Sequence, residues 1–380
     1  FFNGGLGFLY DFDLAFADHF ARVREIFTGY YKTPANQPDL NLRFSNVIAD
    51  LMLPQRALMG GWAMGIPALY LLISSVREKS YRQTALLALW AAALPLVHTH
   101  TFLALALFSG GCLLGNLIEH REERRGVLLR AGLYLAVVLA LALPQLVGNA
   151  VRQTLEGGAL RFQFNWVNNS GGRGLKDGYF WFWVKNAGLP FILTVCACLC
   201  ARKRGHLDIV LGMTAIYAVA ETILFQPNEY DNNKLFYIWF MFAMILAADY
   251  GSMLMQRLAG LPGRALLCGL FLWASVFSGA LSLGREAVSG YQLFSANAVA
   301  AGDWIRENTD RDDVFLTGQQ HINPVCSLAG RQIICGSDLY VFFHGLDYSQ
   351  QSADCRRFYE SPRENADVLE TYNVHYIYVS

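Results

Sequence analysis

The sequence predicts an α-helical membrane protein that crosses the bilayer several times, with broken helices, followed by a C-terminal α/β domain. Its 380 residues are 54% hydrophobic but only 16% charged, whereas soluble domains carry about 25% charged residues. Apolar stretches about as long as a membrane span recur between residues 57 and 284. The 30 basic and 30 acidic residues cancel, so no overall basic field favours nucleic acid as a partner.

Residues 84–118 form the most informative stretch, because they contain no Asp, Glu, Lys or Arg. This run is too long for one ordinary span and too short for two spans with a loop. Pro95 lies near its middle and is expected to break the helix. We predict a short helix over 84–96, a break carrying His98 and His100, and a full helix over 101–118. Irregular backbone at membrane depth occurs where protein or a water-filled cavity covers it, so we expect the break to line a polar cavity.

The remaining apolar stretches complete a transmembrane domain over residues 56–285. By length they predict spans over 57–75, 127–148, 189–201, 207–225, 235–256 and 265–284, which gives about eight crossings in all. Basic residues cluster in four alternate connections, at 77–82, 121–125, 202–204 and 257–264. Because basic loops stay on the cytoplasmic side, the opposite, extracytoplasmic side would hold 1–55, His98 and His100, 150–178, 226–233 and everything after 285.

The flanking regions differ in character from the spans. Residues 1–55 predict an extracytoplasmic or interfacial segment, and residues 286–380 a soluble domain. In the latter, helical spacing over 295–310 and 362–373 alternates with strand patterns at 313–318, 331–336 and 374–380. The chain reads as a fragment open at both ends. Its eight cysteines show no metal-ligand spacing.

His98 and His100 are the first candidate site residues. Two residues apart, they do not share a helix face, but in an extended break both can face a cavity and contact a substrate. The alternative is that they bond the backbone groups that Pro95 frees. A zinc ion needs three or four ligands, and no third ligand stands at a recognisable spacing, so we assign no metal site.

The second candidate is the segment PNEYDNNK, residues 227–234, between two predicted spans. Glu229 and Asp231 are candidate catalytic carboxylates, and we expect them to point the same way in an extended turn. Lys234 opens the next helix, where the helix dipole favours an anion. It would therefore bind Asp231 or a substrate phosphate. The alternative is a merely solvated connection.

The third candidate is NLRFSNVIADLMLPQR, residues 41–56, at the entry to a span. Arg43, Asp50, Gln55 and Arg56 are its candidate substrate-binding residues. Arg56 stands at a helix start, where an anionic ligand would offset the unfavourable dipole. The alternative is that Arg56 extends toward lipid head groups.

These motifs together resemble a known group. The segments GGLGF, DLNLRFSNVIADLMLPQR, PLVHTHTF, PNEYDNNK, WIRENTDRDDVFLTGQQHINPVCSLAGR and HGLDYSQQSAD are similar to those of bacterial polytopic proteins that look like the GT-C superfamily of lipid-linked-sugar glycosyltransferases. The resemblance implies a multi-pass protein of the bacterial inner membrane that uses a polyprenyl-phosphate-linked sugar on the extracytoplasmic face.

The same resemblance bears on the catalytic base. GT-C enzymes carry an acidic residue in their first extracytoplasmic loop, which acts as base or metal ligand. That loop would precede residue 1, so the base is not assigned within this chain. Asp11 and Asp13 are weak substitutes for it. Whether a divalent cation takes part stays open.

We therefore expect a glycosyltransferase that moves a sugar from a polyprenyl-phosphate donor to an extracytoplasmic glycan, lipid or protein. Arg56 or Lys234 would hold the phosphate, and His98 and His100 would contact the donor. Two alternatives are a membrane transporter with a midplane site, since transporters also use broken helices, and a non-catalytic membrane scaffold. The sequence identifies neither the sugar nor the acceptor.

Overall fold

The computed structural model describes residues 1–11, 19–28, 33–151, 160–168, 176–226, 228–344 and 346–379. The chain divides into two compact units. The helical unit comprises residues 1–152, 161–224 and 229–289, and the tail unit comprises 290–380 with the short pieces 153–160 and 225–228. Asp13, Pro227 and much of the predicted 150–178 loop lie outside the described residues.

Within the described residues, five helices are long and apolar enough to cross a membrane. They are α3 (Arg56–Arg77), α5 (Thr99–Glu119), α6 (Arg124–Gln145), α12 (Asn233–Arg257) and α13 (Arg264–Val288). A sixth span results if α8 (Tyr179–Ala187) and α9 (Leu189–Leu199), which are bent by 116°, count as one. The sequence predicted about eight membrane crossings. The other two candidates, α4 (Tyr81–Ala93) and α11 (Leu207–Thr222), have 13 and 16 residues, which is short for a hydrocarbon core of about 30 Å.

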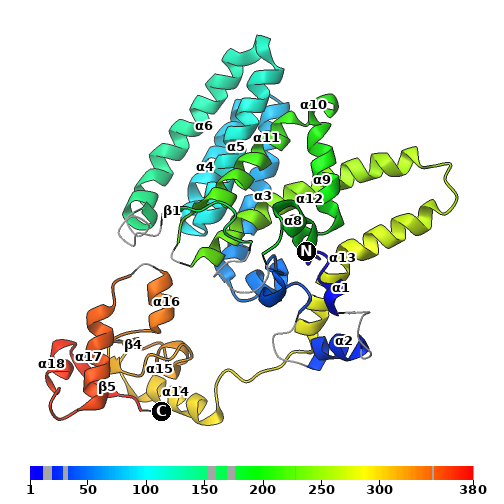
Figure 1. The fold of residues 1–380 in the computed structure, drawn as a ribbon. Coiled ribbons are helices and arrows are strands. Elements are labelled where there is room, and N and C mark those ends of the chain that lie inside the picture. Colours follow the sequence, from blue (N-terminus) through cyan, green and yellow to red (C-terminus); the bar gives the residue numbers. More distant parts are fainter. Residues whose placement is uncertain are drawn as a thin grey trace. The chain divides into compact units, whose positions relative to one another are not determined.

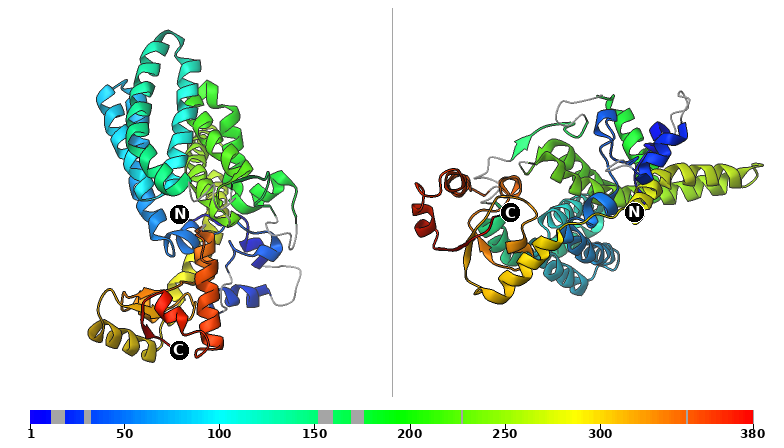
Figure 2. Two further views of the ribbon diagram at one scale, coloured as in Figure 1. Left: turned by 90° about the vertical axis from the view of Figure 1, so that its left-hand side faces the viewer. Right: turned by 90° about the horizontal axis from the view of Figure 1, so that it is seen from below.

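Helices α3, α4, α5, α6 and α11 pack side by side in the helical unit (Figures 1 and 2). Two glycines allow α5 to approach α11 closely. A Cβ atom on Gly111 would lie 2.4 Å from the carbonyl oxygen of Leu211, and one on Gly115 would lie 2.5 Å from the Cα of Asp208. Small residues at such contacts are typical of helices that associate in a membrane.

The predicted break after Pro95 is present but shorter than expected. Helix α4 ends at Ala93, the 3₁₀ turn η3 (Leu94–Leu96) contains Pro95, and α5 begins at Thr99. His98 is extended, with φ −159° and ψ 103°, and precedes the helix. His100 lies in the first turn of α5 and not in the break, because the short 3₁₀ turn accommodates the proline and the helix resumes at once.

The N-terminal residues fold onto the helical unit. They form α1 (Phe8–Asp11), α2 (His19–Thr28), the 3₁₀ turn η1 (Pro38–Leu40) and the π-helical turn η2 (Ile48–Met52). Gly5 has φ +58°, and a Cβ atom there would lie 2.2 Å from the carbonyl oxygen of Lys185. The backbone N–H of Leu6 donates to the same carbonyl at 2.8 Å. The first residues therefore lie directly against α8.

The helical unit also contains short connecting elements. These are η4 (Arg121–Glu123), the π-helical η5 (Leu146–Val151), α10 (Ala201–Arg204), η7 (Glu229–Asn232) and the antiparallel strands β1 (Arg161–Phe162) and β2 (Ile223–Leu224). The β1–β2 pair joins the loop before α8 to the end of α11. Trp166, which follows β1, stacks on Phe236 in the first turn of α12, with 6.1 Å between the ring centroids.

The tail unit contains a parallel sheet of strand order β4-β3-β5. Its strands are β3 (Val314–Leu316), β4 (Gln332–Ile333) and β5 (Val374–Ile377), within the three stretches predicted from sequence. Its helices are α14 (Ala296–Asn308), α15 (Pro324–Ser327), α16 (Asp338–Phe343), α17 (Ser349–Glu360) and α18 (Asp367–Thr371). Phe315 packs with Ile305 and Val325, whereas Leu316 packs with Phe358 and Val368. Adjacent strand residues thus face two separate apolar layers.

Candidate functional site

A cluster of buried polar residues surrounds residues 41–47, which we call the hub segment. Asn41, Ser45 and Asn46 are fully buried and Arg43 is 7% exposed. The segment has no regular helix or strand, so its backbone groups need partners from elsewhere. Most of the partners come from residues distant in the chain.

Helix α8 supplies the first set of partners. The Oδ1 atom of Asn186 accepts hydrogen bonds from the backbone N–H groups of Arg43 (2.7 Å) and Phe44 (3.0 Å), while its Nδ2 donates to the carbonyl of Asn41 at 3.1 Å. The adjacent Lys185, fully buried, donates to the carbonyl of Leu40 at 2.7 Å and forms an ion pair with Asp177. These two residues anchor the hub segment from one side.

Two tyrosines anchor the hub segment from another side. Tyr230 in η7 donates its hydroxyl to the carbonyl of Arg43 at 2.6 Å, and Tyr237 in α12 donates to the carbonyl of Ser45 at 2.8 Å. At the N-terminus, Asn3 donates to the carbonyl of Ser45 at 2.5 Å and accepts from the N–H of Val47 at 3.0 Å. The hub segment therefore joins three parts of the chain.

Four residues of this cluster were not predicted from the sequence: Lys185, Asn186, Tyr230 and Tyr237. A signal was present for the first two, because Lys185 follows the apolar run FWFWV. An ionisable residue inside an apolar span is a functional candidate by default. The tyrosines gave no such signal, since aromatic residues are common at membrane interfaces.

Arg43 is a buried cation with little neutralisation nearby. Its Nε donates to Oδ1 of Asn41 at 3.3 Å, and no carboxylate forms an ion pair with it in the described part of the chain. Glu229 and Asp39 act on it only at longer range. Burial lowers the pKa of Arg43. A desolvated guanidinium with spare donors is suited to bind a phosphate group.

Lys234, His98 and His100 lie near one another. The ammonium group of Lys234 interacts electrostatically with both imidazoles and forms an ion pair with Asp231 at 2.9 Å. The two imidazole centroids are 5.5 Å apart, and Nδ1 of His98 is hydrogen-bonded to the Thr101 hydroxyl at 2.8 Å. The Nε2 atom of His100 is buried and has no hydrogen-bond partner among the described residues.

The expectation that Glu229 and Asp231 point the same way is wrong. These residues lie in the 3₁₀ turn η7 and not in an extended turn. With about three residues per turn, side chains two positions apart diverge. Glu229 forms an ion pair with Arg161 at 3.6 Å, whereas Asp231 pairs with Lys234.

Asp50, Gln55 and Arg56 follow the hub segment. Asp50 lies in η2, and its backbone N–H donates to the carbonyl of Asn46 in the hub segment at 2.9 Å. Gln55 precedes α3 and forms no side-chain cap. Arg56 is the exposed first residue of α3, and the structure shows no ion pair for it with any described residue. Asp50 therefore lies at the hub segment, whereas no such contact is seen for Gln55 or Arg56.

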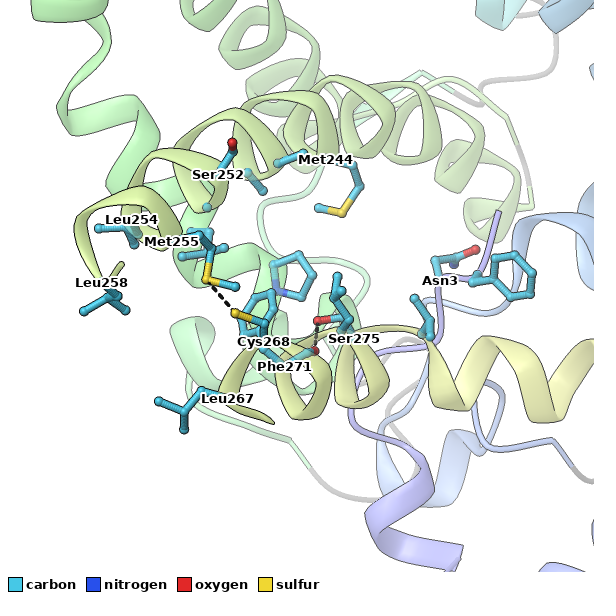
Figure 3. Close-up of a pocket in the computed structure, with 18 of the residues that line it drawn as sticks. Asn3, Met244, Ser252, Leu254, Met255, Leu258, Leu267, Cys268, Phe271 and Ser275 are labelled. Carbon is cyan, nitrogen blue, oxygen red and sulfur yellow. Dashed lines mark hydrogen bonds between the residues drawn. The ribbon is translucent and has the colours of Figure 1, made fainter. Parts of the chain in front are cut away.

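Helices α12 and α13 border an apolar groove with a volume of about 650 Å³ (Figure 3). Its lining includes Phe240, Met244 and Leu254 from α12, Leu258 just after it, and Leu267 and Phe271 from α13. Figure 3 shows Leu258 toward one end and Asn3 at the other. Because Asn3 also bonds the hub segment, the apolar groove and the polar cluster meet at this residue.

Among the described residues, no three His, Cys, Asp or Glu side chains are grouped so that they could hold a metal ion. The polar site of this structure is therefore built from cations, tyrosines and amides, with carboxylates that are mostly paired. No family model matches the chain, and the search of curated proteins also gives no match.

Proposed function

We propose that this chain belongs to a GT-C-like integral-membrane glycosyltransferase that moves a sugar from a polyprenyl-phosphate donor to an extracytoplasmic acceptor. The observation that carries the proposal is the connection between the apolar groove and the hub segment through Asn3. A polyprenyl phosphate combines a long apolar chain with an anionic head. A site for it needs an apolar groove that ends near a buried cation. The groove reaches Asn3, which bonds Ser45, and the buried Arg43 lies two residues before Ser45 in the same segment.

The dimensions of the apolar groove support a lipid chain as its occupant. Its lining follows α12 from Phe240 to Met255, which corresponds to about 22 Å along a helix. The hydrocarbon core of one bilayer is about 30 Å thick. The groove thus has room along its length for several isoprene units.

The positions of the charged groups support the chemistry of transfer. As the bond between sugar and phosphate breaks, negative charge develops on the leaving phosphate. Fixed cations stabilise such charge strongly in a water-poor site. Arg43 and Lys234 are assigned this role. His98 and His100, which lie within electrostatic range of Lys234, are assigned to the sugar of the donor.

The proposed orientation follows from the helix ends. The starts of α3, α5 and α12 adjoin Asp50, His98 and Lys234, whereas basic residues follow the far ends of the same helices, at 77–82, 121–125 and 257–264. By the positive-inside rule, the hub segment is assigned to the extracytoplasmic side. The bacterial inner membrane is proposed from the resemblance to the GT-C superfamily. The tail unit follows α13 and is assigned to the same side as the hub segment.

The test uses the purified chain in lipid nanodiscs with a panel of radiolabelled decaprenyl-phosphate hexoses and pentoses. We expect binding of decaprenyl phosphate to the wild type, and release of decaprenyl phosphate from at least one donor when membrane glycans or lipids are supplied as acceptor. Arg43→Gln should weaken binding of decaprenyl phosphate. A wild-type protein that binds no lipid phosphate would contradict the proposal.

One observation favours a transporter as the second candidate. The bend between α8 and α9 is 116°, at Gly188 with φ +83°, and Lys185 and Asn186 lie just before it. Discontinuous helices of this kind hold substrates and ions in transporters. Uptake of a labelled sugar phosphate into proteoliposomes, without cleavage of a lipid donor, would support this candidate over the enzyme.

A further inference from the structure

We propose that the C-terminal end of α11 binds a monovalent alkali cation, such as Na⁺, through the side chain of Glu221. This side chain is only 2% exposed, and neither oxygen of its carboxylate has a hydrogen-bond partner among the described residues. No lysine or arginine of the described chain lies within electrostatic range of it. An isolated buried carboxylate is strongly unfavourable. Glu221 therefore needs a positive partner that the described residues do not supply.

The position of Glu221 in its helix also favours a cation. Glu221 is the last residue but one of α11, which ends at Thr222. The final carbonyl groups of a helix carry partial negative charge, so this end attracts cations and disfavours an acidic side chain. Ends of discontinuous helices coordinate Na⁺ in this way in membrane transporters. A bound cation would offset the charge of the carboxylate and the helix dipole together.

Two asparagine side chains bring further oxygen atoms to the same helix end. The backbone N–H of Asn165 donates to the carbonyl of Glu221 at 3.2 Å. Nδ2 of Asn232 donates to the carbonyls of Ala220 at 3.0 Å and Ile223 at 2.9 Å. The Oδ1 atoms of both asparagines are buried and have no hydrogen-bond partner in the described part of the chain. Carboxylate and amide oxygens accept hydrogen bonds but do not donate them, and such oxygens are the ligands of hard cations.

Helix α8 packs against this end of α11. Tyr217 precedes Glu221 by about one helical turn, so the two side chains share a face of α11. The hydroxyl of Tyr217 is hydrogen-bonded to that of Tyr179 in α8 at 2.5 Å, and both hydroxyls lie within electrostatic range of the Glu221 carboxylate. Trp183 of α8 packs on Tyr217 with 5.5 Å between the ring centroids, and its N–H acts on the two hydroxyls and not on Glu221. The ion would therefore stabilise the contact of α11 with the helix that anchors the hub segment.

The charge of the site fits a monovalent ion. Glu221 supplies one negative charge and the remaining oxygens are neutral, whereas Ca²⁺ sites use several carboxylates and Mg²⁺ keeps several waters. The alternative is protonation of Glu221. A proton would neutralise the carboxyl group but would leave the oxygens of Asn165 and Asn232 without donors. A cation can be coordinated by all of them, and it needs no open channel because helix ends open locally.

The test measures thermal unfolding of the purified chain in detergent, while NaCl or KCl replaces choline chloride at constant ionic strength and pH. Choline is too large for the site and gives the baseline. The melting temperature should rise saturably with Na⁺ or K⁺, by about 3 °C or more at about 100 times the Kd. Equilibrium binding of radioactive sodium, or of rubidium in place of potassium, should approach one ion per chain.

Glu221→Gln should abolish the cation dependence, because it removes the charge and keeps the size of the side chain. Glu119→Gln is the matched control, since Glu119 is an exposed carboxylate at the C-terminal end of α5, and it should respond as the wild type does. Glu221→Asp retains the charge and should respond at higher cation concentration, which tests the site even where Glu221→Gln does not fold.

A wild type whose melting temperature depends on neither Na⁺ nor K⁺ overturns the proposal, and Glu221 is then neutralised by a proton. A Glu221→Gln variant that still responds to the cation also overturns it. These measurements need no sugar transfer. A failure of the proposed glycosyl transfer therefore leaves the cation site untouched, and the absence of the cation site leaves the proposed transfer untouched.

Discussion

The hydroxyl of Tyr230 donates a hydrogen bond of 2.6 Å to the backbone carbonyl of Arg43, which precedes it by 187 residues. This contact joins η7 to the hub segment, so two motifs that the sequence offered as separate candidates form one site. It also fixes the backbone of the residue assigned to the phosphate. Tyr230 therefore contributes to the site through position and not through charge.

Tyr230→Phe should destabilise the helical unit. The substitution removes the donor to a buried carbonyl, and an unsatisfied buried group costs about 1–3 kcal/mol. Thermal unfolding of the purified protein in detergent measures the effect. Tyr70→Phe is the matched control, because Tyr70 on α3 is 70% exposed and should unfold as the wild type does. Equal stability of both variants would show that the hydrogen bond to Arg43 contributes nothing.

Lys234→Ala should reduce sugar transfer about a hundredfold, since loss of one electrostatic contact to a developing charge costs about 3 kcal/mol. Lys234→Arg should keep most of the rate, because the charge is retained. Radiolabelled transfer in nanodiscs is the measurement. Asp303 and Arg306 form an ion pair of the same spacing but are each at least 50% exposed, so Asp303→Asn should leave the rate unchanged. Full activity of Lys234→Ala would mean that η7 only connects two helices and takes no part in sugar transfer.

The sequence predicted those features that depend on residues close together in the chain, and not those that depend on distant contacts. Pro95 lacks a backbone donor, and the chain does leave the α-helix there, although the helix resumes soon enough to include His100. The polar residues of 41–56 also stand out within an apolar chain. Their partners could not be inferred, because Asn186 is 143 residues from Arg43 and nothing in either segment specifies the other. The turn type of η7, which separates Glu229 from Asp231, is likewise set by its tertiary contacts.

Gly111→Ala should destabilise the contact between α5 and α11. Its Cβ would lie 2.4 Å from the backbone carbonyl of Leu211, so the helices must separate, at a cost of about 1–3 kcal/mol. The neighbouring Gly110 has nothing within 4 Å of a Cβ atom, and Gly110→Ala should be neutral or gain up to about 1 kcal/mol of helix propensity. Thermal unfolding distinguishes the two variants. Equal melting temperatures would mean that α5 and α11 are not this close.

Ala248→Trp should weaken donor binding, because Ala248 lines the apolar groove and an indole there would occupy the space of the lipid chain. The KM for a decaprenyl donor should rise at least tenfold, and a short-chain donor should be less affected. Ile245→Trp is the control on the same helix, since Ile245 is 57% exposed and does not line the groove. A decaprenyl KM that is the same in both variants would place the lipid chain elsewhere.

Asp50→Asn should stabilise the protein at high pH. The pKa of Asp50 is raised by burial in the folded protein to about 6 from its ordinary value of 3.8, so folding favours the protonated acid. The stability that this group contributes is fully present below pH 3.8 and is lost as the pH rises through about 6. A shift of this size corresponds to at most about 3 kcal/mol. Asparagine cannot ionise, so the variant avoids that loss.

The measurement is the difference in unfolding free energy between Asp50→Asn and the wild type, at pH 8 and at pH 4, because other groups titrate equally in both proteins. The variant should be the more stable protein at pH 8, and most of the difference should disappear at pH 4. Asp303→Asn, at a site 50% exposed, should show no such trend. A variant less stable than the wild type at pH 8 would instead make Asp50 a structural carboxylate.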